Sequence, residues 1–370
     1  MNPIQKLIKN LFAKKRIIGD YADLKGLIKA DAMLNDLVAQ EKVPGISITV
    51  LKEGKLFYQK GIGCADLLNK TSINAGETLF RIASVSKPIA ATALANMVKK
   101  GIIDLDASFY KYVPYYPKKK WDFTMRQLAN HTAGIRGYKG IEYGLNKPYT
   151  IKESIRVFKD DDLLFEPGTD YFYNSYGWVL ISLAMQEASG IPFEDYVRQT
   201  VLTPLGLQRT TAPKEAVFEE KNDTVLSTKY VTFYSKNRLG FRKAIPVNNF
   251  FKLAGGGYLS TSEDIANFGQ ALLNGKLLSL GLTEQFLTSE IIADKKTYYG
   301  LGWQVTEDEK GRPYFGHVGN GVGGYSNFFV YPDEKMVFAI LINCTNPNIQ
   351  TELDSVRNVF LETLDGQNSV

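Results

Sequence analysis

The sequence contains few of the residues on which several familiar kinds of site depend. Among its 370 residues there are two cysteines, Cys64 and Cys344, and two histidines, His131 and His317. Two cysteines so far apart cannot build a disulfide framework, and we expect both to be buried thiols in or near strands. The chain has no His-Glu-x-x-His motif and no other dense set of metal ligands. The sequence therefore predicts neither a metal site nor a bound cofactor.

Two common catalytic and binding motifs are also excluded. No Gly-x-Ser-x-Gly elbow occurs, which argues against an α/β-hydrolase. Gly319-x-Gly321-x-x-Gly324 has the glycine spacing of a dinucleotide-binding loop, but a strand-like stretch at 325–330 follows where that motif requires a helix. We interpret these glycines as a loop that lets the backbone approach a bound ligand.

Long apolar runs and a general positive charge are absent as well. No run reaches the ~18 apolar residues of a membrane-spanning helix. The net charge is +5, and residues 1–29, with seven basic and two acidic side chains, account for all of it. The remainder is neutral overall, which argues against nucleic-acid binding.

The N-terminal segment carries this positive charge on an amphipathic pattern. Residues 4–16 place apolar side chains on one helical stripe and lysines elsewhere. Such a helix could make peripheral contact with an anionic membrane, or it could pack against the rest of the protein. As written, the sequence predicts a cytoplasmic or peripheral membrane protein; a signal peptide removed beforehand would indicate a periplasmic or secreted one.

Hydrophobic patterns predict an α+β fold. We expect an antiparallel five-stranded sheet, built from both chain ends and flanked by helices, with a mainly helical region inserted. The predicted units are a basic N-terminal segment at 1–20, a sheet domain at 21–100 and 297–370, and a mainly helical domain at 101–296. The predicted helices of the sheet domain lie at 24–38, 89–98 and 350–364, and its strands at 46–51, 55–62, 300–306, 314–319, 325–331 and 337–343.

The segment 80–88 contains a candidate nucleophile, Ser84. Lys87 follows three residues later, which places both side chains on the same side of a helical turn. Pro88 is tolerated only in a first helical turn, so the helix must begin near Ser84. The helix dipole there would stabilise an anion, and with partial burial it would lower the pKa of Lys87. Taken alone, however, the pair is more typical of an ordinary helix-capping serine.

Other motifs at ordered positions change this interpretation. The whole set resembles the serine β-lactamase and penicillin-binding protein superfamily, in particular its class C-like branch, which also holds D-aminopeptidases, D-alanyl-D-alanine carboxypeptidases and esterases. The resemblance extends from about Leu34 to Leu361. It is carried by Ser84-Val85-Ser86-Lys87, Gln127–Gly134, Tyr173-Asn174-Ser175, Ala254–Thr261 and Gly316-His317-Val318-Gly319-Asn320.

The resemblance implies roles for three catalytic residues. Ser84 would attack a carbonyl carbon and become acylated. Lys87 and Tyr173 would share the proton transfers, with a tyrosinate or phenol beside an ammonium acting first as base and then as acid. The family also implies an oxyanion hole formed by backbone N–H groups of Ser84 and Asn320.

The remaining site residues would bind the substrate. Ser175 and Gly319 would line the substrate or oxyanion site beside Asn320, and His317 would orient Tyr173 or contact the substrate. His131 is expected to be a structural histidine behind the site.

Two departures from the family pattern bear on the substrate. Ser175 stands where an amide is usual, and His317 stands where β-lactamases have a lysine that pairs with a substrate carboxylate. We therefore expect a serine acyl-hydrolase of small-molecule esters or peptides, with little β-lactamase activity. A non-catalytic binding or scaffold member of the fold is the alternative. The sequence does not indicate an oligomeric state.

Overall fold

The structure is a computed structural model that describes residues 21, 23–213, 230–276 and 279–363. The predicted amphipathic helix at 4–16 lies outside the described residues, so its membrane contact remains a prediction. Within the described part of the chain, no helix is long and apolar enough to cross a membrane.

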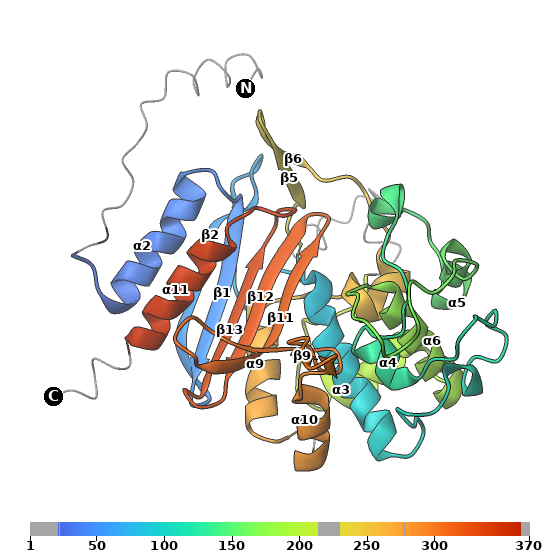
Figure 1. Cartoon of the computed structure of the whole chain (residues 1–370). Coiled ribbons are helices and arrows are strands. Elements are labelled where there is room, and N and C mark those ends of the chain that lie inside the picture. Colours follow the sequence, from blue (N-terminus) through green and yellow to red (C-terminus); the bar gives the residue numbers. More distant parts are fainter. Residues whose placement is uncertain (1–20, 22, 214–229, 277–278, 364–370) are drawn as a thin grey trace.

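The core element is an antiparallel sheet to which both chain ends contribute, as predicted (Figure 1). Its central pairing joins β1, near the N-terminus, to β13, near the C-terminus, with Ile46 opposite Ile342. The strand order is β10-β11-β12-β13-β1-β2-β3. The strands are β1 (Gly45–Lys52), β2 (Lys55–Asp66), β3 (Thr71–Ser72), β10 (Gln304–Glu307), β11 (Pro313–Gly321), β12 (Gly324–Tyr331) and β13 (Met336–Ile342).

The prediction of five strands is wrong, because the sheet has seven. Short edge strands, β3 and β10, extend it on either side. β3 pairs only two residues, too few to show an alternating pattern. The strand expected at 300–306 begins only at Gln304, since Gly302 has φ +87° and interrupts the extended backbone.

Each face of the sheet is covered by helices. Helices α2 (Gly26–Ala39) and α11 (Gln350–Glu362) pack together over one face (Figure 1). Helix α9 (Ser262–Leu273) covers the other face, and the Thr261 side chain caps its N-terminus by accepting from the backbone N–H of Asp264. Because both faces are buried, β13 is apolar throughout. Alternate residues of β13 contribute to two separate cores.

Helix α3 (Ser86–Lys99), which corresponds to the predicted apolar helix, is buried along most of its length. It ends with Lys99 in its last turn, and Gly101 beyond it has φ +69°. Its many alanines let neighbouring elements approach closely, including α6 (Tyr176–Ser189), α7 (Phe193–Val197) and α10 (Leu280–Leu287).

The inserted region carries mostly short helices, together with hairpins that the sequence patterns did not predict. Strand β4 (Phe80–Arg81), just before the candidate nucleophile, pairs with β7 (Leu259–Ser260) near the end of this region. Its other elements are η2 (Phe109–Lys111), α4 (Met125–Ala129), η3 (Gly140–Gly144), α5 (Ile151–Ser154), η4 (Ile155–Val157), η5 (Arg198–Leu202), β5 (Tyr234–Asn237), β6 (Gly240–Lys243), η7 (Phe250–Lys252), η8 (Leu253–Gly257), β8 (Ile291–Ile292) and β9 (Lys295–Lys296).

Candidate active site

Ser84 lies in a single helical turn, η1 (Ala83–Val85), between β4 and the buried helix α3. Ala83 has φ +45°, an unusual backbone conformation for a residue with a side chain. Strained backbone of this kind often occurs at functional sites. Ser84 itself is partly exposed, whereas its neighbours Ala83 and Val85 are buried. The turn therefore presents Ser84 to solvent from a rigid, buried support.

Lys87 reaches Ser84 from the first turn of α3. Its side chain is fully buried, and Nζ lies 3.1 Å from Ser84 Oγ, 2.7 Å from the Tyr173 hydroxyl and 3.5 Å from Ser175 Oγ. Nζ also donates to the carbonyl of Gly255 at 2.8 Å. Burial lowers the pKa of Lys87 to about 7. A large fraction of this amine is therefore unprotonated at neutral pH and can accept a proton.

Tyr173 completes a triangle with these two residues. Its hydroxyl donates to Ser84 Oγ at 2.8 Å and accepts from Lys87 Nζ. The residue is 38% exposed, and its hydroxyl faces both partners. Burial raises the pKa of Tyr173 well above its ordinary value, and the bond to Ser84 opposes this only in part. These directions favour a neutral phenol beside a neutral amine over the tyrosinate–ammonium pair.

The edge of β11 supplies the candidate oxyanion site. The N–H of Val318 points to the outer edge of this strand, where it donates to the Gln304 side chain at 2.9 Å. In an antiparallel strand, alternate N–H groups point the same way, so the N–H of Asn320 faces the same edge beyond the end of β10. The Asn320 side chain is turned to the backbone N–H of Asn346 at 3.2 Å.

Gly319 brings this edge against Ser84. A Cβ added to Gly319 would lie 3.0 Å from the backbone nitrogen of Ser84 and would collide with Ser326 Oγ and the Ile82 carbonyl. Because only glycine allows this approach, β11 and η1 pack directly together. The predicted donors, the N–H groups of Ser84 and Asn320, thus come from two elements in contact.

His317 lies behind Tyr173, with ring centroids 5.9 Å apart, and only 1% of it is exposed. Its Nδ1 is 2.6 Å from its neighbour's carbonyl at Val318, so this nitrogen carries the proton. Its Nε2 then accepts from the Tyr299 hydroxyl at 2.9 Å. Burial, helped by nearby Lys87, lowers the pKa of His317 to about 3. Both nitrogens have partners within the protein, and the ring itself lies beside that of Tyr173.

His131 also lies behind the site. It is 1% exposed, and its ring centroid is 4.6 Å from that of Tyr173 and 4.7 Å from that of Tyr299. Burial, reinforced by Lys87, lowers its pKa well below the ordinary value. Sequence reasoning missed Tyr299, because no motif surrounds it; its place between the two histidines arises only from the tertiary fold.

In the second motif, Tyr173-Asn174-Ser175, the Asn174 and Ser175 side chains have different partners. Asn174 faces away from Lys87: its Oδ1 accepts from the backbone N–H of Gly177 at 2.7 Å, and its Nδ2 donates to the Phe172 carbonyl at 3.0 Å. Asn174 therefore fixes the start of α6, while Ser175 faces Lys87.

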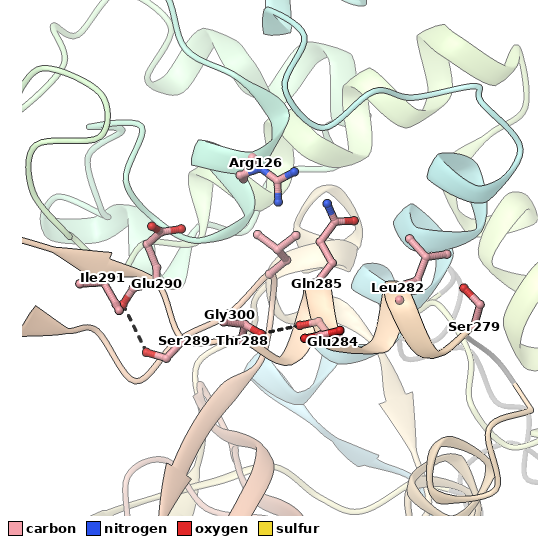
Figure 2. Close-up of a pocket in the computed structure, with 12 residues that line it drawn as sticks. Arg126, Ser279, Leu282, Glu284, Gln285, Thr288, Ser289, Glu290, Ile291 and Gly300 are labelled. Atoms are coloured by element: carbon pink, nitrogen blue, oxygen red, sulfur yellow. Dashed lines mark hydrogen bonds between the residues drawn. The ribbon is translucent and has the colours of Figure 1, made fainter.

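The structure also contains a hollow of about 790 Å³ away from this site (Figure 2). Figure 2 shows Arg126, from α4, across from Gln285, from α10, with Glu290 beside them. None of the candidate catalytic residues lines it. The Glu290 carboxylate accepts from the Asn130 side chain at 2.7 Å, so one wall of this hollow contacts the segment that carries His131.

Comparison with known proteins agrees with this geometry. A family model described as Beta-lactamase matches residues 30–359. The chain belongs to this family. The motif resemblance is therefore confirmed, and with it a fold of the β-lactamase and transpeptidase type.

Individual members of the family have low sequence identity to this chain, but the similarity extends over most of its length. The human serine β-lactamase-like protein LACTB, a mitochondrial protein, is 27% identical over 82% of this chain and 71% of its own length. Penicillin-binding protein 4* of Bacillus subtilis is 25% identical over 80% of this chain and 67% of its own. The crystal structure of a D-stereospecific amidohydrolase from Streptomyces sp. superposes with a TM-score of 0.72 at 25% identity, covering 85% of this chain and 94% of that one. The family and these neighbours are serine hydrolases.

Proposed function

We propose that the chain hydrolyses an ester or a peptide, such as a carboxylic ester or a D-amino-acid peptide, through an acyl-Ser84 intermediate. The observation that carries the proposal is the triangle of contacts among Ser84 Oγ, Lys87 Nζ and the Tyr173 hydroxyl, each 3.1 Å or shorter. A D-stereospecific amidohydrolase and a penicillin-binding protein among its relatives support this substrate class.

The first half-reaction follows from this triangle. The neutral amine of Lys87 takes the proton of Ser84, directly or through Tyr173, as Oγ attacks the carbonyl carbon. The resulting oxyanion is stabilised by the N–H groups of Ser84 and Asn320, each worth about 3–4 kcal/mol in comparable enzymes. The proton then passes to the leaving alcohol or amine, with Tyr173 placed to deliver it, and acyl-Ser84 remains.

The second half-reaction reverses these roles. The neutral amine of Lys87, directly or through Tyr173, accepts a proton from the water that attacks the acyl-Ser84 carbonyl, and this proton returns to Ser84 Oγ as the acid is released. His317, being buried and neutral, supplies no positive charge to pair with a substrate carboxylate. This supports substrates that lack a carboxylate at that position, rather than β-lactams.

Covalent labelling tests the acyl-Ser84 step. We expect a fluorophosphonate probe to label the wild-type protein on the tryptic peptide that contains Ser84, and Ser84→Ala to abolish labelling. Folded wild-type protein that takes up no label would contradict the proposal and favour a non-catalytic scaffold.

A substrate panel distinguishes among the possible acyl and leaving groups. p-Nitrophenyl esters, D-amino-acid peptides and nitrocefin should be compared with wild type, Lys87→Ala and Tyr173→Phe. We expect esters or peptides to be turned over faster than nitrocefin, and both variants to lose this activity. Turnover that survives in both variants would assign the reaction to other residues.

We also propose that the basic segment 4–16 makes peripheral contact with anionic membranes, on the strength of its sequence pattern alone. Deleting residues 2–16 should reduce co-sedimentation with phosphatidylserine-containing vesicles. Unchanged co-sedimentation would dismiss this contact.

A further inference from the structure

Tyr299 contacts two different parts of the candidate active site. It is 2% exposed, and its ring lies against His131 and Tyr173, with centroids 4.7 Å and 5.9 Å away. Its hydroxyl reaches His317 Nε2, 2.9 Å away. One side chain therefore contacts the candidate proton donor through its ring and the third motif through its hydroxyl.

The backbone of Tyr299 is held in place from behind. Its carbonyl accepts from the backbone N–H of Glu290 at 2.9 Å, and the Glu290 carboxylate accepts from the Asn130 side chain at 2.7 Å. Asn130 directly precedes His131. The segment that carries Tyr299 is therefore joined to the segment that carries His131, and both rings pack behind Tyr173.

The other nitrogen of His317 determines which atom donates in the bond to Tyr299. Nδ1 is 2.6 Å from the Val318 carbonyl, which can only accept, so Nδ1 carries the proton of the neutral ring. Nε2 must then accept, and the Tyr299 hydroxyl donates. Burial raises the pKa of Tyr299 well above its ordinary value, so the hydroxyl keeps its proton throughout the neutral range.

The Val318 carbonyl needs a side-chain partner because of its place in the sheet. Strand β10 pairs with residues 313–316 of β11, and the N–H of Val318 faces the edge beyond this pairing. In an antiparallel strand the N–H and C=O of one residue point the same way, so this carbonyl faces the same edge. The Gln304 side chain accepts from the N–H, and the His317 ring donates to the carbonyl. Two side chains thus take the place of a paired strand.

The peptide that His317 holds is the one that approaches the nucleophile. The Val318 carbonyl belongs to the same rigid peptide plane as the N–H of Gly319, the residue packed against the Ser84 backbone. A half-turn of the imidazole about its Cβ–Cγ bond would place carbon atoms where the two nitrogens lie. The Tyr299 hydroxyl opposes this rotation, because the turned ring would leave both the hydroxyl and the carbonyl unpaired.

We propose that Tyr299 is a positioning residue of the active site. Its hydroxyl holds the His317 ring on the Val318 carbonyl, which fixes the edge of β11 beside Ser84. Its ring supports that of Tyr173. This inference rests on the proposed function, since it concerns the oxyanion site and the proton donor of that reaction. Tyr299 is buried and need not touch the substrate.

A double-mutant cycle on ester hydrolysis tests whether Tyr299 acts through His317. Tyr299→Phe keeps the ring but removes the hydroxyl, and we expect kcat/KM for a p-nitrophenyl ester to fall about tenfold. His317→Asn keeps a polar group near the position of Nδ1 but removes Nε2. In that background Tyr299→Phe should lower kcat/KM by no more than about twofold, because the partner of the hydroxyl is already absent. Equal losses in both backgrounds would overturn the proposal, and so would wild-type kcat/KM in Tyr299→Phe.

Tyr298→Phe is the matched control for this cycle. Tyr298 is the preceding residue, but it is 55% exposed, and the loss of its hydroxyl should leave kcat/KM at the wild-type value. A fall as large as that in Tyr299→Phe would mean that any change in this segment disturbs the site, which would also overturn the proposal.

An NMR measurement separates this inference from the proposed function. The sequence contains two Val-Gly pairs, Val318-Gly319 and Val322-Gly323. Labelling valine with 13C at the carbonyl and glycine with 15N therefore selects two peptides, and Val322→Ile assigns them. We expect Tyr299→Phe to shift the amide resonance of Gly319 and to leave that of Gly323 in place.

The histidine rings provide a second signal in the same variant. The sequence contains two histidines, so 15N-histidine labelling reports two rings, and His317→Asn assigns them. The Nε2 resonance of His317 should move to higher frequency in Tyr299→Phe as its hydrogen bond is lost. Shifts of His317 and Gly319 support the positioning role even if wild type turns over no ester, in which case only the proposed function fails. An unchanged Gly319 resonance refutes the positioning role whether or not an ester is turned over.

Discussion

At the scale of single residues, the site depends on a lysine kept away from water. A buried amine is a useful base because it loses its proton near neutral pH. Burying its charged form, however, destabilises the folded state. The two consequences of burying Lys87 can be measured separately, one in the reaction rate and one in the free energy of unfolding.

The rate should depend on pH through Lys87. Only the unprotonated amine accepts the Ser84 proton, and its pKa is about 7. We expect kcat/KM to fall about tenfold for each pH unit below 7 and to level off above it. His317, with a pKa of about 3, stays neutral in this range. His317→Asn should therefore lower kcat/KM without changing the pH at which kcat/KM begins to fall. Steady-state measurements of kcat/KM from pH 5 to 9 check this prediction, and a pH-independent kcat/KM would contradict it.

The lowered pKa of Lys87 should also make the free energy of unfolding depend on pH. An unfolded lysine keeps its proton up to about 10.5, whereas folded Lys87 loses it above about 7, so the folded state gains stability as pH rises between these values. Below pH 7 the folded protein bears the whole cost of burying an ammonium. Lys87→Met removes this cost but leaves the Gly255 carbonyl without its donor.

We therefore expect Lys87→Met to be inactive yet more stable than wild type by about 2–4 kcal/mol at pH 6. This advantage should shrink at pH 9. Urea denaturation at the two pH values measures it. A variant that is less stable than wild type at pH 6 would show that the contacts of Lys87 outweigh its desolvation.

At the scale of elements, the site is made where β11 meets η1. Strand β11 belongs to the C-terminal part of the chain and η1 to the N-terminal part, and Gly319 is the point of closest approach. A methyl group at Gly319 must push the strand away from Ser84, which would separate the two oxyanion donors.

Gly319→Ala should therefore lower kcat/KM by about 10²-fold or more, the usual effect of losing one such donor. Gly281→Ala in α10 is a suitable control, because an added Cβ there meets no atom within 4 Å. Ester hydrolysis and fluorophosphonate labelling rates measure both. Wild-type labelling of Gly319→Ala would mean that the strand edge takes no part in the reaction.

The sequence was a good guide to these elements where pattern and local chemistry agree. The aromatic-rich stretch of β12, the apolar run of β13 and the helix beginning beside Pro88 could be predicted directly from the sequence. Short edge strands and the hairpin of β5 and β6 could not, because their residues are few or polar and their pairing depends on neighbours. Within the site, motifs point to Ser84 and Tyr173, but Tyr299 reaches it through tertiary packing from a segment without a signature.

At the scale of the whole molecule, the sheet separates two cores. One lies under α2 and α11 and includes Phe360; the other, on the opposite face, includes α3 and Phe251. The candidate catalytic residues lie beside this second core. Because β1 pairs with β13, both cores need the two ends of the chain to meet before either is complete.

This arrangement predicts that stability and catalysis can be separated by core. Phe360 is fully buried, with its ring 5.1 Å from Tyr58 and 6.1 Å from Phe338. Phe360→Ala should lower the free energy of unfolding by about 3–4 kcal/mol through lost contacts and the cavity left behind. At 25 °C, well below the melting temperature, its kcat/KM should remain that of wild type, because the sheet isolates the active site from the cavity.

Phe251→Ala is the matched change in the other core. Phe251 is also fully buried, but its turn η7 leads directly into η8, where the Gly255 carbonyl accepts from Lys87. We expect a similar loss of stability, this time accompanied by a fall in kcat/KM, since a shift of η7 and η8 would displace this partner of Lys87. Urea denaturation and ester hydrolysis on the two variants measure both quantities. Equal losses of activity in the two would mean that the sheet transmits packing defects and that the cores act as one.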